Sequence, residues 1–243
     1  MVDDAVVLDA HWCPPLVGPA RPGGTPDRMG ETAAGFLNRR EAGRVLASGL
    51  AHHRGAAGTV VLGLARGGVP VGWEVAAALG LVFHAFLVRK LGLPHWPELA
   101  MGALATGGTV VRNEDVIRSQ AVTEDQLREV IERERLELRR REAAYGVGES
   151  PELAGRTAIL VDDGIATGAS MLAAIRAVRA LGAARVVVAV PVASRTATRL
   201  VGREADELVC LDEPPDFRAV GQAYADFTQT SDDEVRALLA RRP

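Results

Sequence analysis

Two adjacent carboxylates followed by a glycine-containing turn are the residues of this 243-residue chain best suited to chemistry. Residues 161–170 read Val-Asp-Asp-Gly-Ile-Ala-Thr-Gly-Ala-Ser and follow an apolar run at 157–161. From Ala169 onward the apolar residues recur at helical spacing. The pattern therefore predicts a strand, then a loop that carries Asp162 and Asp163, then a helix.

A loop of this kind is suited to a sugar phosphate. At the start of a helix several backbone N–H groups lack intrahelical partners, and the helix dipole favours negative charge. Thr167 and Ser170 add hydroxyl donors to this loop. Asp162 and Asp163 could accept hydrogen bonds from the vicinal hydroxyls of a ribose, or hold a divalent cation through oxygen ligands.

Two further segments predict contacts with the same ligand. A β-branched run at 59–64 leads into Ala-Arg-Gly-Gly at 65–68, and an apolar run at 81–88 leads into Arg-Lys at 89–90. In an open parallel sheet, ligands bind at the carboxyl ends of the strands. We therefore expect both segments to meet residues 162–170 at that edge.

Lys90 stands out in the composition. The chain has 28 Lys and Arg residues, and position 90 is the only lysine among them. An ammonium group is a compact point charge suited to phosphate, whereas a guanidinium group is a rigid fork, so the two are not interchangeable. We interpret Lys90 as a phosphate contact; a surface lysine with no such role is the alternative.

Strands and helices alternate along the rest of the chain. The further predicted elements are helices over 36–50, 123–145, 169–181 and 231–239 and strands over 185–190 and 207–211. Such alternation predicts an α/β fold, namely a doubly wound, mostly parallel sheet with helices on both faces.

The domain organisation follows from the composition of the connecting segments. Residues 1–34 are rich in proline and glycine and predict a flexible arm, so a single domain is expected over 35–243. Residues 91–109 predict a mobile lid loop, with His95 and Glu98 as its polar candidates. Residues 213–243 predict a small hood or a C-terminal helix.

Charge and hydropathy exclude several classes of protein. A formal charge of -3 argues against a non-specific nucleic-acid binder. No apolar run approaches the roughly 18 residues of a membrane span, and Asp3 and Asp4 stand where a secretory signal would be positive. Cys13 and Cys210 lie far apart without metal-ligand spacing, which is typical of thiols in a reducing compartment. These observations predict a cytoplasmic protein.

The glycine motifs of other phosphate-binding folds do not occur. The chain has no Gly-x-x-x-x-Gly-Lys-Ser/Thr and no Gly-x-Gly-x-x-Gly, so it is neither a P-loop protein nor a dinucleotide-binding protein. Residues 161–170 instead resemble the phosphoribosyl pyrophosphate signature of type I phosphoribosyltransferases. Residues 65–68 resemble the pyrophosphate loop of that family, and Val88-Arg89-Lys90 resembles the Arg-Lys pair that precedes its catalytic loop in the adenine and orotate members. The resemblance spans about 36–192, and it is closest to predicted bacterial members of unassigned substrate.

The resemblance implies transfer of ribose 5-phosphate between pyrophosphate and a nitrogen nucleophile, with Mg²⁺ as cofactor and small molecules as the only partners besides a second copy in a homodimer. Catalytic roles fall to Asp162, Asp163, Arg89 and Lys90, and the two aspartates would bind Mg²⁺ directly, through water or through ribose hydroxyls. The substrate-binding residues it implies are Arg66, Gly67, Gly68, Ala166, Thr167, Gly168, Ala169 and Ser170.

The acceptor is not identified by these motifs. Ala166 stands where hypoxanthine-guanine members carry an aspartate, which disfavours that substrate. Phe217, Tyr224 and Phe227 are the candidates for stacking on an acceptor ring, with packing in a small satellite core as the alternative. A regulatory protein that binds phosphoribosyl pyrophosphate without turnover, and a hydrolase of phosphoribosyl compounds, remain the alternatives to a transferase.

Overall fold

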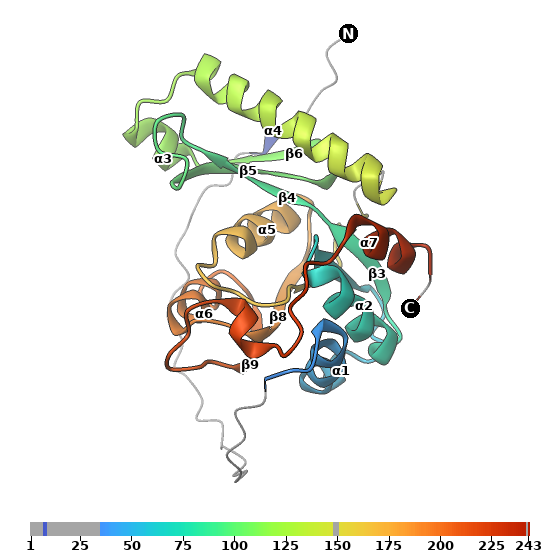
Figure 1. Ribbon diagram of the computed structural model, residues 1–243. Helices are drawn as coiled ribbons and strands as arrows, with labels where there is room; N and C mark the ends of the chain where they lie inside the picture. Colours follow the sequence, from blue (N-terminus) through green and yellow to red (C-terminus); the bar gives the residue numbers. More distant parts are fainter. Residues whose placement is uncertain (1–6, 9–34, 148–150, 242) are drawn as a thin grey trace.

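The fold is organised around a parallel β-sheet. The computed structural model describes residues 7–8, 35–147, 151–241 and 243 (Figure 1). The sheet has five strands in the order β3-β2-β7-β8-β9, and every neighbouring pair is parallel. Its strands are β2 (Thr59–Leu64), β3 (Val82–Phe86), β7 (Thr157–Val161), β8 (Arg185–Val192) and β9 (Glu207–Asp212). This is the α/β sheet that the alternation of elements predicts.

Helices cover both faces of the sheet because alternate residues of each strand point to opposite sides. In β7, Ile159 and Val161 pack with α1 (Arg39–Gly49) and α2 (Gly68–Leu79). On the other face, Ala158 and Leu160 pack with α5 (Ala169–Ala180) and α6 (Arg195–Val201). Every residue of β2 is buried, as expected for a central strand covered on both sides.

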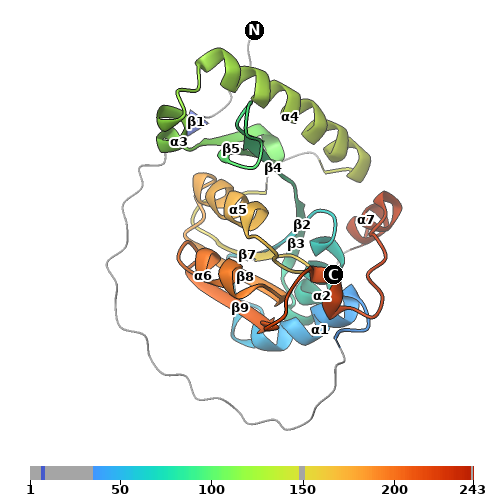
Figure 2. The ribbon, with the colours of Figure 1, turned by 60° about the vertical axis from the view of Figure 1, so that its left-hand side comes forward.

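A second layer lies against the outer side of α5. It contains β4 (Val88–Gly92), β5 (Ala100–Ala105) and β6 (Thr109–Arg112), paired antiparallel, with α3 (Glu114–Ser119) and α4 (Glu124–Tyr145). We call this unit the antiparallel layer. Its sheet lies between α4 and α5, and Figure 2 shows the same arrangement from another side. The capping box at Thr123 and Gln126 begins α4, as the sequence predicts.

The prediction that residues 91–109 form a loop is wrong, because most of this segment is regular secondary structure. Residues of this segment form the end of β4, all of β5 and then η2 (Thr106–Gly108), and the exposed residues are those of the connection at 94–98 and Gly107. The apolar side chains of Leu91, Met101 and Leu104 are buried between the β-strands and α4, and that burial stabilises strands where the glycines and prolines suggest a loop. The strand expected over 81–88 is likewise divided, since β3 ends at Phe86 and β4 begins at Val88.

The two ends of the chain add smaller contacts. The C-terminal segment contains η3 (Val220–Ala223) and α7 (Asp232–Leu239), which begins at the Ser231 cap and packs against α4 and α2. Most of the arm expected over 1–34 lies outside the described residues, but β1 (Val7–Leu8) pairs parallel with β6. Among the described residues, no helix combines the length and the apolar character needed to cross a bilayer.

Candidate functional site

The carboxyl ends of β2 and β7 bring two loops together. These strands are neighbours, with Gly63 opposite Val161 in the register, so the loops that follow them start side by side. A Cβ atom at Gly67 would overlap the carboxylate of Asp163, and one at Gly68 would lie 2.8 Å from the Cα atom of Asp162. Glycine at 67 and 68 therefore lets the backbone of the first loop lie directly against both carboxylates.

Arg39 is a site residue that the sequence patterns did not identify. It is the first residue of α1, and its Nε donates to Asp163 Oδ2 at 2.7 Å. Its Nη1 donates to the carbonyl of Thr228 at 2.7 Å, and the guanidinium carbon lies 4.0 Å from the ring centroid of Phe227. Arg39 is separated from Asp163 by 124 positions in sequence, so no local spacing could have indicated the pair.

Burial and the neighbouring charges shift the pKa of both aspartates. It raises the pKa of Asp162 well above its ordinary value, and the charge of Asp163 raises it further. Burial also raises the pKa of Asp163, while the hydrogen bond and charge of Arg39 act in the opposite direction. Two half-buried carboxyls thus lie beside one guanidinium, an arrangement that favours an additional cation or hydroxyl donors at this place.

The loop after β7 contains backbone N–H groups that have no hydrogen-bond partner among the described residues. Gly168 has a φ of 85°, the left-handed conformation that permits the tight turn into α5. The carbonyl of Ala166 accepts a hydrogen bond from the Ser194 hydroxyl at 2.7 Å, which anchors the loop from behind. Within the described part of the chain, no acceptor bonds the backbone N–H of Ala166, Thr167, Gly168 or Ser170. Free donors at a helix start are suited to a phosphate.

The loop after β2 has the same property. The backbone N–H groups of Arg66, Gly67 and Gly68 have no acceptor in the described ranges, and the peptide bond between Ala65 and Arg66 is cis. The side chain of Arg66 extends to α7, where its Nη1 lies 3.4 Å from Asp232 Oδ1. Two sets of free donors therefore lie on either side of the aspartates.

Arg89 and Lys90 lie in β4, in the antiparallel layer rather than at the end of a strand of the parallel sheet. Arg89 donates from Nε and Nη2 to Glu134 of α4, at 2.9 and 2.6 Å. Lys90 Nζ lies 3.3 Å from both the carbonyl and the carboxylate of Glu98. A cavity of about 150 Å³ between β4–β6 and α5 is lined by Lys90 and by residues of α5 that include Ala169, so Lys90 and the start of α5 border the same cavity.

The aromatic cluster lies beneath the carboxylates. Tyr224 is 7% exposed, its hydroxyl donates to the carbonyl of Asp163 at 2.6 Å, and its ring centroid lies 5.1 Å from that of Phe227. Phe217 packs half-buried in the same cluster. The structure thus gives Tyr224 a supporting position behind Asp163, while contact of Phe217 with an acceptor ring stays a prediction. His95 is exposed on the connection between β4 and β5.

The chain is similar to known proteins over most of its length. The family described as phosphoribosyl transferase domain matches residues 40–228. Two Mycobacterium tuberculosis proteins named as phosphoribosyl transferases, MT0597 from strain CDC 1551 / Oshkosh and Rv0571c from strain H37Rv, are each 48% identical over 207 residues. The matches cover 85% of this chain but 46% of those proteins, so the chain spans about half the length of these curated relatives. The crystal structure of TT1426 from Thermus thermophilus has a TM-score of 0.77 and 45% identity, covering 84% of this chain and 97% of that one.

Proposed function

The chain belongs to the phosphoribosyl transferase domain family, and from that premise we propose that it transfers a ribose 5-phosphate group between phosphoribosyl pyrophosphate and a nitrogenous acceptor such as a nucleobase. One observation carries this proposal. Two loops whose N–H groups have no acceptor among the described residues flank a half-buried pair of carboxylates at the carboxyl edge of the sheet. Phosphoribosyl pyrophosphate has the matching chemistry, because its ribose carries a phosphate at one end, a pyrophosphate at the other and two vicinal hydroxyls between them.

The loop after β7 would bind the 5-phosphate. The free N–H groups of Ala166, Thr167, Gly168 and Ser170 supply donors in the place where the dipole of α5 is positive. Thr167 and Ser170 are exposed and add hydroxyl donors. Ala169 is the first residue of α5, and its N–H would be a further donor. This loop therefore fixes one end of the substrate without a positively charged side chain.

Asp162 and Asp163 would accept hydrogen bonds from the ribose hydroxyls and help to hold Mg²⁺. The two side chains fit this ion, because carboxylate oxygens are its preferred protein ligands and a cation between them would offset the repulsion by which Asp163 raises the pKa of Asp162. Within the described residues no third acidic side chain joins them in a metal-binding group, so substrate oxygens and water would fill the other positions. Bound there, Mg²⁺ would neutralise charge that develops on pyrophosphate as it departs.

The loop after β2 would bind the pyrophosphate. Arg66, Gly67 and Gly68 have backbone N–H groups with no acceptor among the described residues, and glycine at 67 and 68 lets this loop lie against Asp162 and Asp163. Lys90 would add a positive charge from the antiparallel layer, because it lines the cavity that reaches Ala169. Arg89 would contribute only if it exchanged its Glu134 partner for the substrate.

The chemistry this arrangement favours is electrostatic. As the bond between the anomeric carbon and pyrophosphate lengthens, positive charge develops on the ribose and negative charge on the leaving group. Donors held in place beforehand stabilise that separation more than water does, because they need not reorient during the reaction. The carboxylates lie beside the ribose in this proposal, so their negative charge would also favour the cationic sugar.

The test is pyrophosphate release measured with the protein, Mg²⁺ and phosphoribosyl pyrophosphate in the presence of a panel of nucleobases. Release that depends on one base is the expected result. Release without any base would instead identify a hydrolase, and tight binding without turnover a sensor. The Asp162→Asn/Asp163→Asn double variant should lose Mg²⁺-dependent binding of the sugar, whereas Asp216→Asn, a change at an exposed aspartate, should bind like wild type. Unchanged affinity in the double variant would overturn the assignment of the pocket.

A further inference from the structure

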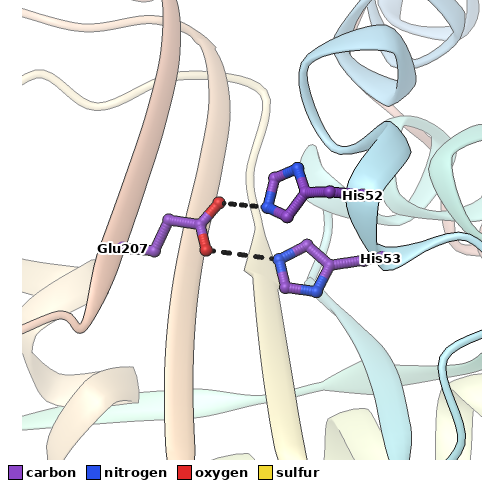
Figure 3. Close-up of side chains that lie close together, drawn as sticks. All are labelled: His52, His53 and Glu207. Atoms are coloured by element: carbon purple, nitrogen blue, oxygen red, sulfur yellow. Dashed lines mark hydrogen bonds and ion pairs between the residues drawn. The ribbon is translucent and has the colours of Figure 1, made fainter. Parts of the chain in front are cut away.

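A second group of potential ligands lies at the opposite edge of the sheet. His52 and His53 belong to η1 (Ala51–His53), which follows α1, and Glu207 is the first residue of β9 (Figure 3). Because β9 is parallel to its neighbour, its first residue lies at the amino edge, away from Asp162 and Asp163. None of these three residues has a role in the proposed transfer reaction.

Both imidazoles point at one carboxylate. His52 Nε2 lies 2.8 Å from Glu207 Oε1, and His53 Nε2 lies 3.3 Å from Glu207 Oε2. The two rings lie close together, with centroids 4.1 Å apart, although adjacent residues of a helix ordinarily point in different directions. One potential ligand atom from each of the three residues lies within 4.8 Å of the others, and this is the single such group among the described residues.

We infer that His52, His53 and Glu207 bind a transition-metal ion of the zinc type. Imidazole nitrogen and carboxylate oxygen are the ligands this ion takes in sites with two histidines and one glutamate. With bonds of about 2.0–2.1 Å in a tetrahedron, ligand atoms lie roughly 3.3 Å apart. The imidazole nitrogens lie 2.8 and 3.3 Å from different oxygens of Glu207, and one ligand atom of each residue lies within 4.8 Å of the others, so the side chains would have to close around the ion. Three protein ligands leave the fourth position for water.

Access and burial suit such a site. His53 is 8% exposed and so is held by its surroundings, whereas His52 is exposed and leaves a path for the ion. The same geometry also permits imidazole N–H groups to donate to Glu207. An ion would displace these hydrogen bonds, because a coordinating ring nitrogen carries no proton.

Arg185 is the competing cation. Its Nη2 lies 3.0 Å from Glu207 Oε2, the oxygen that also faces His53. A bound ion and the guanidinium would repel each other and would share this carboxylate. Removal of the Arg185 charge should therefore tighten metal binding, an effect that nonspecific binding to an exposed histidine would not show.

An ion coordinated by His52, His53 and Glu207 would link η1 to β9. Since η1 continues from α1, the ion would hold the far end of the helix that carries Arg39 at its start. Binding to the folded state alone stabilises it by linkage, so the melting temperature should rise with Zn²⁺ concentration. At a hundredfold excess over the dissociation constant, the rise should be about 5 °C or more.

The experiment is a titration of the metal-free full-length chain with Zn²⁺ by calorimetry, with Co²⁺ absorption as a readout of the ligand set. One ion per chain and Co²⁺ bands typical of nitrogen and oxygen ligands are expected. Glu207→Gln and His53→Asn should each weaken binding at least tenfold, and Arg185→Met should strengthen it. Circular dichroism of each variant establishes that it is folded.

Two controls separate this site from other sources of binding. His95→Asn removes an exposed histidine elsewhere and should leave the affinity unchanged. The Asp162→Asn/Asp163→Asn variant should also keep the Zn²⁺ site, so failure of the proposed transferase reaction would not affect this inference. Equal Zn²⁺ affinity and stoichiometry in wild type, Glu207→Gln and His53→Asn would overturn it.

Discussion

Arg39 Nε donates to Asp163 Oδ2 at 2.7 Å, and this pair joins the start of α1 to the loop after β7. The two side chains are only 11% and 14% exposed. The pair also fixes the carboxylate beside Gly67, where the proposed ligand would bind. Arg39 thus links the stability of the fold to the geometry of the site.

Arg39→Ala should destabilise the protein by about 3 kcal/mol, the lower end for a broken buried pair, because it leaves a mostly buried carboxyl without its partner. The pKa of Asp163 should rise further above its ordinary value, since the hydrogen bond and charge that lower it are lost. Urea unfolding measures the first effect, and affinity for phosphoribosyl pyrophosphate should fall in parallel. Arg39→Lys is the matched control and should be intermediate, because an ammonium keeps the charge but not the fork that also reaches Thr228. A variant as stable as wild type would contradict this account.

Tyr224→Phe should cost about 1 kcal/mol of stability, because it removes the hydrogen bond to the carbonyl of Asp163 without changing the ring that packs on Phe227. The loop that carries Asp163 would lose its support, so affinity for the sugar phosphate should fall as well. Chemical denaturation and a binding titration measure the two effects. If Tyr224 instead stacked on the acceptor ring, the phenylalanine would preserve binding, and that outcome would favour the stacking role.

Gly67→Ala should abolish binding of phosphoribosyl pyrophosphate and destabilise the fold, because the added methyl group would overlap the carboxylate of Asp163. Gly80→Ala is the matched control. Gly80 ends α2 with a φ of 66° and nothing lies within 4 Å of its added Cβ, so the strained backbone should cost about 1 kcal/mol. That variant should be less stable than wild type yet bind the substrate normally. Normal binding by Gly67→Ala would show that the loop can move away from Asp163.

His84 should make the protein less stable in acid. Burial, and then the charge of Arg156, lower the pKa of this side chain below the ordinary value of 6.5. The unfolded chain therefore binds a proton more readily than the folded one, so stability is complete above about pH 6.5 and is lost as the pH falls toward the lower folded pKa. His84→Gln should lose less stability than wild type between about pH 7 and pH 5, as measured by thermal unfolding at each pH. His95→Gln, at an exposed position, should follow wild type; equal pH profiles for all three proteins would contradict the prediction.

The local pattern of the chain determined the parallel sheet and the elements on it. Short continuous apolar runs such as 59–64 and 157–161 are typical of strands covered on both faces, and their alternation with helical segments favours a parallel sheet. The loops at 65–68 and 162–170 were also predictable, because a glycine turn between a strand and a helix has a fixed place in such a sheet.

The antiparallel layer was not predictable by the same means. The segment 91–108 has glycine and proline at a density typical of loops, and its strands are stable because Leu91, Met101 and Leu104 are buried beneath α4. Burial of this kind depends on a partner element that is distant in sequence, and no local period records it.

Sequence alone therefore determined which backbone groups could bind a sugar phosphate, since strand, turn and helix follow from neighbouring residues. Only the tertiary structure decided which side chains come together, at the proposed site and elsewhere in the fold. Arg39 reaches Asp163, Tyr224 supports it from behind, Arg89 pairs with Glu134, and two histidines meet Glu207. Each of these contacts joins elements far apart in the chain, where packing of whole helices against the sheet, and not local spacing, sets the distance.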